Sequence, residues 1–310
     1  MSIFVTGHKS PDTDSICSAI SYAALKSAQG QTATAICAGQ ANKETTFALE
    51  TFGFQHPQIV NNFSEVVKEG DDVILVDHNE SKKIIDGKEN VTIIEVVDHH
   101  RFGDFETDSP IYIRVEPVGC TGTIVTKLYE EAGLEIPKNI AGLLMSAIIS
   151  DTVLFRSPTC TEQDKAAVKK LSAIAGVDYE TYGMDMLKAG ADISDLSNEQ
   201  IVRTDMKEFS EAGQTISIAQ ISVMDTTDVL AKQAELVAAL EALRTENKYA
   251  ASYLMVTNIL EEATTLLFAG DVEGIVTSAF AKDIVNNGVY LPNVMSRKKQ
   301  IAPPILGAMK

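Results

Sequence analysis

An apolar run that ends in one aspartate and two histidines constrains the fold of this 310-residue chain more than any other stretch. Ile93–Val97 is rich in β-branched side chains, and Asp98, His99 and His100 follow it directly. A nearly continuous apolar run predicts a strand that is covered on both faces, as in a parallel sheet. Ligands of open α/β folds collect beyond the carboxyl ends of such strands. The sequence therefore predicts a functional site directly after residue 97.

The histidines of the chain are segregated rather than scattered. Four of the five, His8, His78, His99 and His100, follow apolar runs and lie beside aspartates, and no histidine follows residue 100. Histidines that only fill a core would not be distributed in this way. We therefore interpret them as parts of one site at the ends of several strands.

Aspartates occupy equivalent places elsewhere. Asp12 and Asp14 follow the first predicted strand, Asp77 follows the strand at residues 73–76, and Asp151 follows an apolar helix. Taken singly, Asp12 and Asp14 are equally typical of helix N-caps, and Asp77 of a turn. A carboxylate at a helix C-terminus, however, faces an unfavourable dipole unless a cation compensates it. The pattern as a whole favours a metal site.

The predicted ligand set is too large for one ion. Two imidazoles and four carboxylates suit two ions that share a bridging carboxylate, and an oxygen-rich set without thiolates suits octahedral Mn²⁺, Co²⁺ or Mg²⁺ better than structural zinc. Histidines argue against calcium. Two ions about 3.5–4 Å apart can activate a bridging water and clamp phosphoryl oxygens. The candidate ligands are His8, Asp12, Asp14, Asp77, His99 and Asp151.

The charge of the chain excludes several classes of partner. A formal net charge of −17 argues against binding to nucleic acid or anionic membranes, so an anionic substrate must be held by local cations. The longest apolar stretch, around residues 140–149, is shorter than the ~18 residues of a membrane span. The four cysteines lie far apart and lack paired zinc spacing. We expect a cytoplasmic protein with reduced cysteines.

Alternating strand and helix patterns predict an α/β fold with two domains. The first domain, residues 1–189, should contain a doubly wound, mainly parallel sheet. Glycine, serine and aspartate predict a linker at residues 190–196, followed by a smaller α/β domain at 197–310. The second domain is predicted to contain a polar helix at 198–209, strands at 215–223, 252–257 and 264–269, an amphipathic helix at 229–243 and a basic loop at 296–300.

Several motifs, in order over the whole chain, resemble the manganese-dependent (family II) inorganic pyrophosphatases of the DHH phosphoesterase superfamily. The Asp98–His100 triplet alone is also found in RecJ-like nucleases and short-oligonucleotide phosphodiesterases, whereas the Ser296–Gln300 loop is more specific. The resemblance implies an N-terminal DHH domain and a C-terminal DHHA2-type domain. The motifs are the turn from His8 to Ser15, Val76–Glu80, Asp98–His100, Ser150–Thr152 and Ser296–Gln300.

The resemblance implies hydrolysis of pyrophosphate to two phosphates in the cleft between the domains, by a water or hydroxide that bridges two Mn²⁺ ions. Co²⁺ would substitute for Mn²⁺, and an additional Mg²⁺ would accompany the substrate. It also implies a homodimer joined through edge strands of the first domains. By resemblance, His8 and Asp12 bind one ion, Asp14, His99 and Asp151 bind the other, and Asp77 bridges them.

The resemblance also assigns residues to the substrate. His100 would face the phosphates as a proton donor, and Asp98 would orient the ligands. Lys207, Arg297 and Lys298 would grip pyrophosphate. A basic run is otherwise typical of a solvated loop, and Lys207, on its predicted polar helix, is equally consistent with plain surface. In so acidic a chain a substrate clamp is the interpretation we prefer for Arg297 and Lys298.

Two other functions are consistent with the same metal ligands. An exopolyphosphatase, or another DHH-type phosphoesterase, would use the same metal core. DHH nucleases carry a glycine-rich motif with histidine in their C-terminal domain, and this chain has no histidine there. A non-catalytic metal-binding or phosphate-binding module would require the loss of ligands, and no ligand position of the family is missing.

Overall fold

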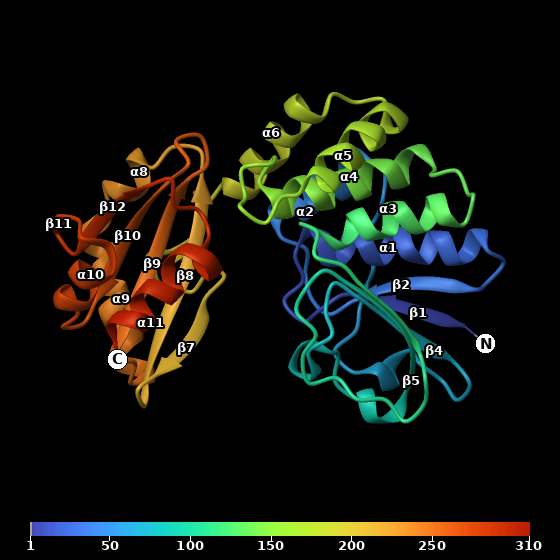
Figure 1. Ribbon diagram of the computed structural model, residues 1–310, viewed down its shortest axis with the longest axis horizontal. Coiled ribbons are helices and arrows are strands. Elements are labelled where there is room, and N and C mark those ends of the chain that lie inside the picture. Colours follow the sequence, from blue (N-terminus) through green and yellow to red (C-terminus); the bar gives the residue numbers. More distant parts are fainter. Residues whose placement is uncertain (1) are drawn as a thin grey trace. The chain divides into compact units, whose positions relative to one another are not determined.

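The protein consists of two compact units, described here by a computed structural model that covers residues 2–310. The first unit extends to Gly190 and the second begins at Ala191. Each unit is built around its own sheet (Figure 1). Among residues 2–310, no helix combines the length and apolar character that a membrane crossing requires. The cytoplasmic location stays a prediction from the sequence.

The sheet of the first unit has the strand order β3-β2-β1-β4-β5-β6, and all neighbouring strands are parallel. This confirms the predicted α/β class with a parallel N-terminal sheet. The order reverses between β1 and β4, which makes the carboxyl ends of these strands a topological switch point, where ligands bind in such folds. The strands are β1 (Ile3–Thr6), β2 (Ala33–Cys37), β3 (Gln58–Ile59), β4 (Asp72–Val76), β5 (Thr92–Asp98) and β6 (Tyr112–Val115).

The two faces of this sheet are covered differently. The α-helices gather on one face, where α1 packs along α3 and α4 (Figure 1). On the other face, Phe63, Ile84 and Ile85, from irregular segments with 3₁₀ turns, pack on Val73 and Leu75. The helices are α1 (Thr13–Ala28), α2 (Lys43–Thr51), α3 (Thr121–Glu131), α4 (Lys138–Thr152), α5 (Glu162–Ala175) and α6 (Tyr179–Ala191).

The connection from β1 to α1 is tight because small and capping residues meet there. Asp12 is the N-cap of α1 and accepts a hydrogen bond from the main-chain nitrogen of Ser15 at 3.0 Å. The hydroxyl of Ser15 in turn accepts from the main-chain nitrogen of His8 at 2.8 Å. A Cβ on Gly7 would lie 1.9 Å from that hydroxyl, so only glycine fits here. These contacts fix the backbone of the turn that carries His8.

The sheet of the second unit is mixed, with the order β11-β12-β10-β9-β8-β7. Only β8 and β9 pair in parallel; the other neighbours in this sheet are antiparallel. This confirms a second α/β domain with its own core. The strands are β7 (Lys207–Glu211), β8 (Gln214–Val223), β9 (Ala251–Asn258), β10 (Ala263–Ala269), β11 (Ile284–Val285) and β12 (Gly288–Pro292).

Helices cover both faces of the mixed sheet. Leu236 and Leu240 of α9 belong to the core on one face, and Val276 of α10 and Ile305 of α11 belong to the core on the other. The helices are α7 (Asn198–Ile201), α8 (Thr227–Leu230), α9 (Gln233–Asn247), α10 (Glu273–Phe280) and α11 (Ala302–Ala308), with a π-helical turn at Arg297–Ile301.

Two local predictions in the second unit are wrong. The polar helix predicted at 198–209 ends at Ile201, because residues from Lys207 onward form β7, which turns into β8 through Ala212 and Gly213, both with positive φ. The basic stretch 296–300 is not a loop but a helical turn that leads into α11. The linker at 190–196 stays a prediction; its first two residues, Gly190 and Ala191, are the end of α6.

Candidate metal centre

The predicted metal ligands of the first unit come together at one edge of the parallel sheet. Neighbouring parallel strands end at the same edge, so residues that follow β1, β4 and β5 converge there. Three overlapping groups of side chains each place one ligand atom per residue within 4.8 Å of the others, and all three include Asp77. The predicted ligands form two of them, called the ligand groups below: His8, Asp12 and Asp77 in the first, and Asp14, Asp77, His99 and Asp151 in the second. The third group is Asp77, His99 and His100.

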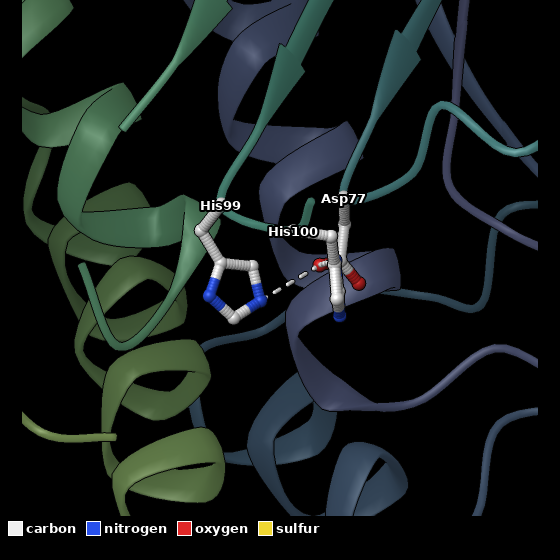
Figure 2. Close-up of side chains that lie close together, drawn as sticks. All are labelled: Asp77, His99 and His100. Atoms are coloured by element: carbon white, nitrogen blue, oxygen red, sulfur yellow. Dashed lines mark ion pairs between the residues drawn. The ribbon is translucent and has the colours of Figure 1, made fainter. Parts of the chain in front are cut away.

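Asp77 lies between the two groups. Its Oδ2 is 3.4 Å from Nε2 of His8, whereas its Oδ1 is 3.4 Å from Nε2 of His99. Figure 2 shows His99 and His100 beside this carboxylate; Nδ1 of His100 is 3.6 Å from Oδ1. Asp77 is almost fully buried, yet its Oδ2 accepts no hydrogen bond from any residue in the range 2–310. A buried oxygen without a donor is costly, and a bound cation would satisfy it.

Asp14 and Asp151 repel each other in the absence of a cation. Burial, and next the charge of Asp77, raise the pKa of Asp14 to about 7. Burial, and next the charge of Asp14, raise the pKa of Asp151 well above its usual range. Asp14 is nevertheless held in place by the main-chain nitrogens of Thr121 and Gly122, at 2.7 and 3.1 Å. Crowded carboxylates that are fixed in this way fit divalent cations.

The imidazoles are oriented by main-chain oxygens. Nδ1 of His8 lies 2.8 Å from the carbonyl of Lys9, and Nδ1 of His99 lies 3.1 Å from the carbonyl of Val118. In the neutral form of each ring Nδ1–H can donate to that carbonyl, which leaves the lone pair of Nε2 for a cation. This arrangement is common for histidines that bind metals. Burial alone would lower the pKa of His99, but hydrogen bonding to Asp77 and its charge raise it to about 9.

His100 is oriented differently, by a buried carboxylate. Oδ1 of Asp98 accepts hydrogen bonds from the main-chain nitrogen of His100 at 3.0 Å and from its Nδ1 at 2.9 Å. Oδ2 of Asp98 accepts from the side-chain amide of Asn79 at 2.6 Å. Asp98 is fully buried, and although burial raises its pKa, the hydrogen bonds from His100 lower the pKa below its usual value. Asp98 therefore stays ionised and fixes the ring of His100.

The sequence did not indicate the roles of two residues near the centre, Asn79 and Glu44. Asn79 lies in the motif after Asp77, but nothing in the sequence indicated that its amide holds Asp98. Glu44, in the first turn of α2, accepts a hydrogen bond from the hydroxyl of Thr13 at 2.8 Å and another from the hydroxyl of Ser150. In the sequence Glu44 looks like an ordinary acidic residue at a helix start.

The predicted substrate cations belong to the second unit. Lys207 is exposed at the start of β7, and Lys298 is exposed in the π-helical turn. Arg297 is only 7% exposed. Its Nη1 donates to the main-chain oxygens of Asp205 and Ile218, and its Nη2 donates to Oδ2 of Asp205 at 2.9 Å. Arg297 is thus anchored within its own unit.

A parallel α/β unit with aspartates and histidines at its switch point, followed by a mixed-sheet unit, defines a two-domain DHH phosphoesterase. The chain matches the DHH family, N-terminal domain, over residues 2–148 and the DHHA2 domain over residues 184–308. Relatives named as manganese-dependent inorganic pyrophosphatases are 47% identical to this chain over nearly their whole length, so the chain belongs to the manganese-dependent, family II, inorganic pyrophosphatases.

The relatives are similar over nearly their whole length. The chain is 47% identical over 308 residues to a "Probable manganese-dependent inorganic pyrophosphatase" of Bacillus licheniformis, covering 99% of each chain. It is 47% identical over 305 residues to a protein of the same name from Shouchella clausii, covering 98% of this chain and 97% of the relative. The crystal structure of a "Methanococcus jannaschii putative family II inorganic pyrophosphatase" matches with 37% identity and a TM-score of 0.80 over 99% of each chain.

Proposed function

We propose that this enzyme hydrolyses inorganic pyrophosphate to two phosphates at a centre for two Mn²⁺ ions in its first unit. The observation that carries the proposal is that both ligand groups share Asp77, whose two oxygens face different histidines. A carboxylate shared in this way is what a pair of ions requires. Co²⁺ would replace Mn²⁺, because an oxygen-rich set with imidazoles suits both ions.

The two ligand groups support a division between two ions. Bound there, the ions would lower the pKa of a shared water and neutralise charge on the phosphoryl oxygens. The carbonyls of Lys9 and Val118 keep the histidine rings in position for binding. In this proposal His8 and Asp12 hold one ion, Asp14, His99 and Asp151 hold the other, and Asp77 contacts both.

His100 is the proposed proton donor to the leaving phosphate. Ionised Asp98 accepts from Nδ1 of His100, which keeps that nitrogen protonated and leaves Nε2 as the nitrogen that exchanges a proton. Asn79 holds the other oxygen of Asp98, so the carboxylate cannot follow a turn of the His100 ring without losing this buried hydrogen bond. His100 would therefore act on the substrate, whereas Asp98 and Asn79 would position it.

Substrate binding is proposed to depend on the cations of the second unit. Lys207, Arg297 and Lys298 would bind pyrophosphate, with an additional Mg²⁺ that arrives with the substrate. A guanidinium pairs well with phosphate because its planar fork makes parallel hydrogen bonds. Hydrolysis would then require both units of the chain.

We also propose a homodimer that forms through β6. This strand is at the edge of the parallel sheet, where it pairs with β5. Tyr112, Ile113 and Val115 of β6 are 44%, 43% and 36% exposed. An unprotected edge with apolar side chains is a template for pairing with another strand, and a second copy of the chain offers the same edge.

A panel of phosphate compounds tests the proposed substrate. Phosphate release is measured with Mn²⁺ from pyrophosphate, tripolyphosphate, long polyphosphate and a dinucleotide under the same conditions. We expect the highest kcat/KM with pyrophosphate. Faster release from long polyphosphate would indicate an exopolyphosphatase, and faster release from the dinucleotide would indicate a phosphodiesterase with the same metal core.

A further inference from the structure

Glu44 connects two helices that carry metal ligands, although it belongs to neither ligand group. Its Oε1 accepts hydrogen bonds from the hydroxyls of Thr13 and Ser150. Thr13 lies between two predicted ligands at the start of α1, and Ser150 directly precedes another at the end of α4. On the basis of the centre proposed above, we propose that Glu44 is a positioning residue that holds these two helix ends so that their carboxylates face the Mn²⁺ ions.

The end of α4 needs such an anchor more than the start of α1. A carboxylate at a helix N-terminus is favoured by the helix dipole, but Asp151 lies at the C-terminal end of α4, where the dipole disfavours it. Directly after the helix, Val153, Leu154 and Phe155 have φ values of 49°, 50° and 70°. Left-handed backbone is unfavourable for these side chains, for a β-branched valine most of all. The hydrogen bond from Ser150 to Glu44 ties this strained end to α2.

Glu44 also contributes charge. The donors Thr13 and Ser150 are neutral hydroxyls, so these two hydrogen bonds leave the negative charge of the carboxylate uncompensated. Burial and the nearby charge of Asp12 both raise the pKa of Glu44, while the two hydroxyls lower it. In this proposal the negative charge of Glu44, close to Asp12, attracts the cations without binding them.

The C-terminal end of α6 packs against the side chain of Glu44. A Cβ on Gly190 would lie 2.8 Å from Cβ of Glu44 and 3.0 Å from its Oε2. Glycine at this position therefore leaves room for the carboxylate to reach its two donors. Gly190→Ala offers a second way to displace Glu44 while its charge is kept.

The decisive measurement is Mn²⁺ binding to the metal-free protein by calorimetry. Glu44→Gln keeps the size of the side chain and removes its charge, and we expect it to lower Mn²⁺ affinity by roughly 10- to 100-fold. Gly190→Ala should lower the affinity in the same direction. Glu50→Gln is the matched control, because it removes the same charge from an exposed position on the same helix. We expect Glu50→Gln to bind Mn²⁺ like the wild type.

The melting temperature of the metal-free protein separates positioning from a purely structural role. Removing one charge from a crowded acidic site should leave this temperature unchanged or raise it. Unchanged Mn²⁺ affinity in Glu44→Gln, or an affinity that falls only together with the melting temperature of the metal-free protein, would overturn the role of Glu44. If the wild type itself binds fewer than two Mn²⁺ per chain, the dinuclear centre fails, whatever Glu44 does.

Discussion

Arg297 donates a hydrogen bond from Nη2 to Oδ2 of Asp205 at 2.9 Å and a second one from Nη1 to the main-chain oxygen of the same residue. Asp205 adopts a φ of 42°, an unusual conformation for a residue other than glycine. The backbone and the side chain of Asp205 thus both serve one guanidinium. A cation that is held in this way can present a fixed geometry to a phosphate, which an exposed lysine cannot.

Arg297→Lys keeps the charge and removes the fork. We expect a higher KM and a lower kcat for pyrophosphate, and a loss of about 1–3 kcal/mol in the free energy of unfolding because the buried main-chain oxygen of Ile218 and the oxygens of Asp205 lose their donors. Steady-state kinetics and urea unfolding check both effects. Arg203→Lys is the control, since Arg203 pairs with Glu246 on the surface of the same unit. Wild-type kinetics in Arg297→Lys would show that Arg297 is structural and not part of a substrate clamp.

Asp77→Ala should weaken Mn²⁺ binding more than Asp12→Ala or Asp14→Ala. Asp77 belongs to both ligand groups, whereas Asp12 and Asp14 each belong to one. We expect Asp77→Ala to affect both ions and the other two variants to affect mainly one. Metal titration of the three metal-free variants measures this. Equal losses at the three positions would contradict a bridging role for Asp77.

The two adjacent histidines should give different phenotypes. His99→Ala should lower Mn²⁺ affinity, because Nε2 of His99 faces Asp77 and Asp151 at 3.4 and 3.5 Å. His100→Ala should keep the metal and lower kcat by roughly 10²- to 10⁴-fold, the usual contribution of a general acid. Metal content is compared with turnover in both variants. A division of roles is excluded if both lose metal to the same extent.

The clustering of the candidate metal ligands could be predicted from the sequence because its signals are local. Each strand of the parallel sheet is a short apolar run, and polar residues such as His8 and Asp77 follow directly where the run ends. Parallel pairing then brings these ends together without further information. The helix starts at Thr13 and Lys43 were predictable for the same reason, because Asp12 and Asn42 cap them from the adjacent position.

What the sequence could not predict depends on contacts between distant segments. Glu44 hydrogen-bonds Thr13, which is 31 positions away in the sequence, and Ser150, which is 106 positions away. No sequence periodicity predicts such contacts. The helix predicted at 198–209 is wrong because helical propensity contributes little free energy. Strand pairing in a hairpin, in which Phe209 pairs with Ile216, outweighs it. The hydrogen bonds between Arg297 and Asp205 could not be predicted, because the residues of a basic run are usually solvated.

The metal-free protein should become less stable as the pH rises from 6 to 9. The pKa of Asp14 is raised from 3.8 to about 7, and that of His99 from 6.5 to about 9. Both groups bind protons more tightly when folded, so their stabilisation is fully present below the unfolded pKa and is lost as the pH passes the folded one. The lowered pKa of Asp77 changes nothing in this range, since that group titrates below pH 3.8.

Urea unfolding of chelator-treated protein between pH 6 and 9 measures this dependence. Asp14→Asn is the control, because it should remove the part of the change that occurs below about pH 7, where Asp14 loses its proton in the folded state. With Mn²⁺ the sign should reverse, since metal binding requires deprotonated carboxylates and neutral imidazole, and affinity therefore increases with pH. A metal-free protein that gains stability from pH 6 to 9 would show that Asp14 and His99 do not hold these protons in the folded state.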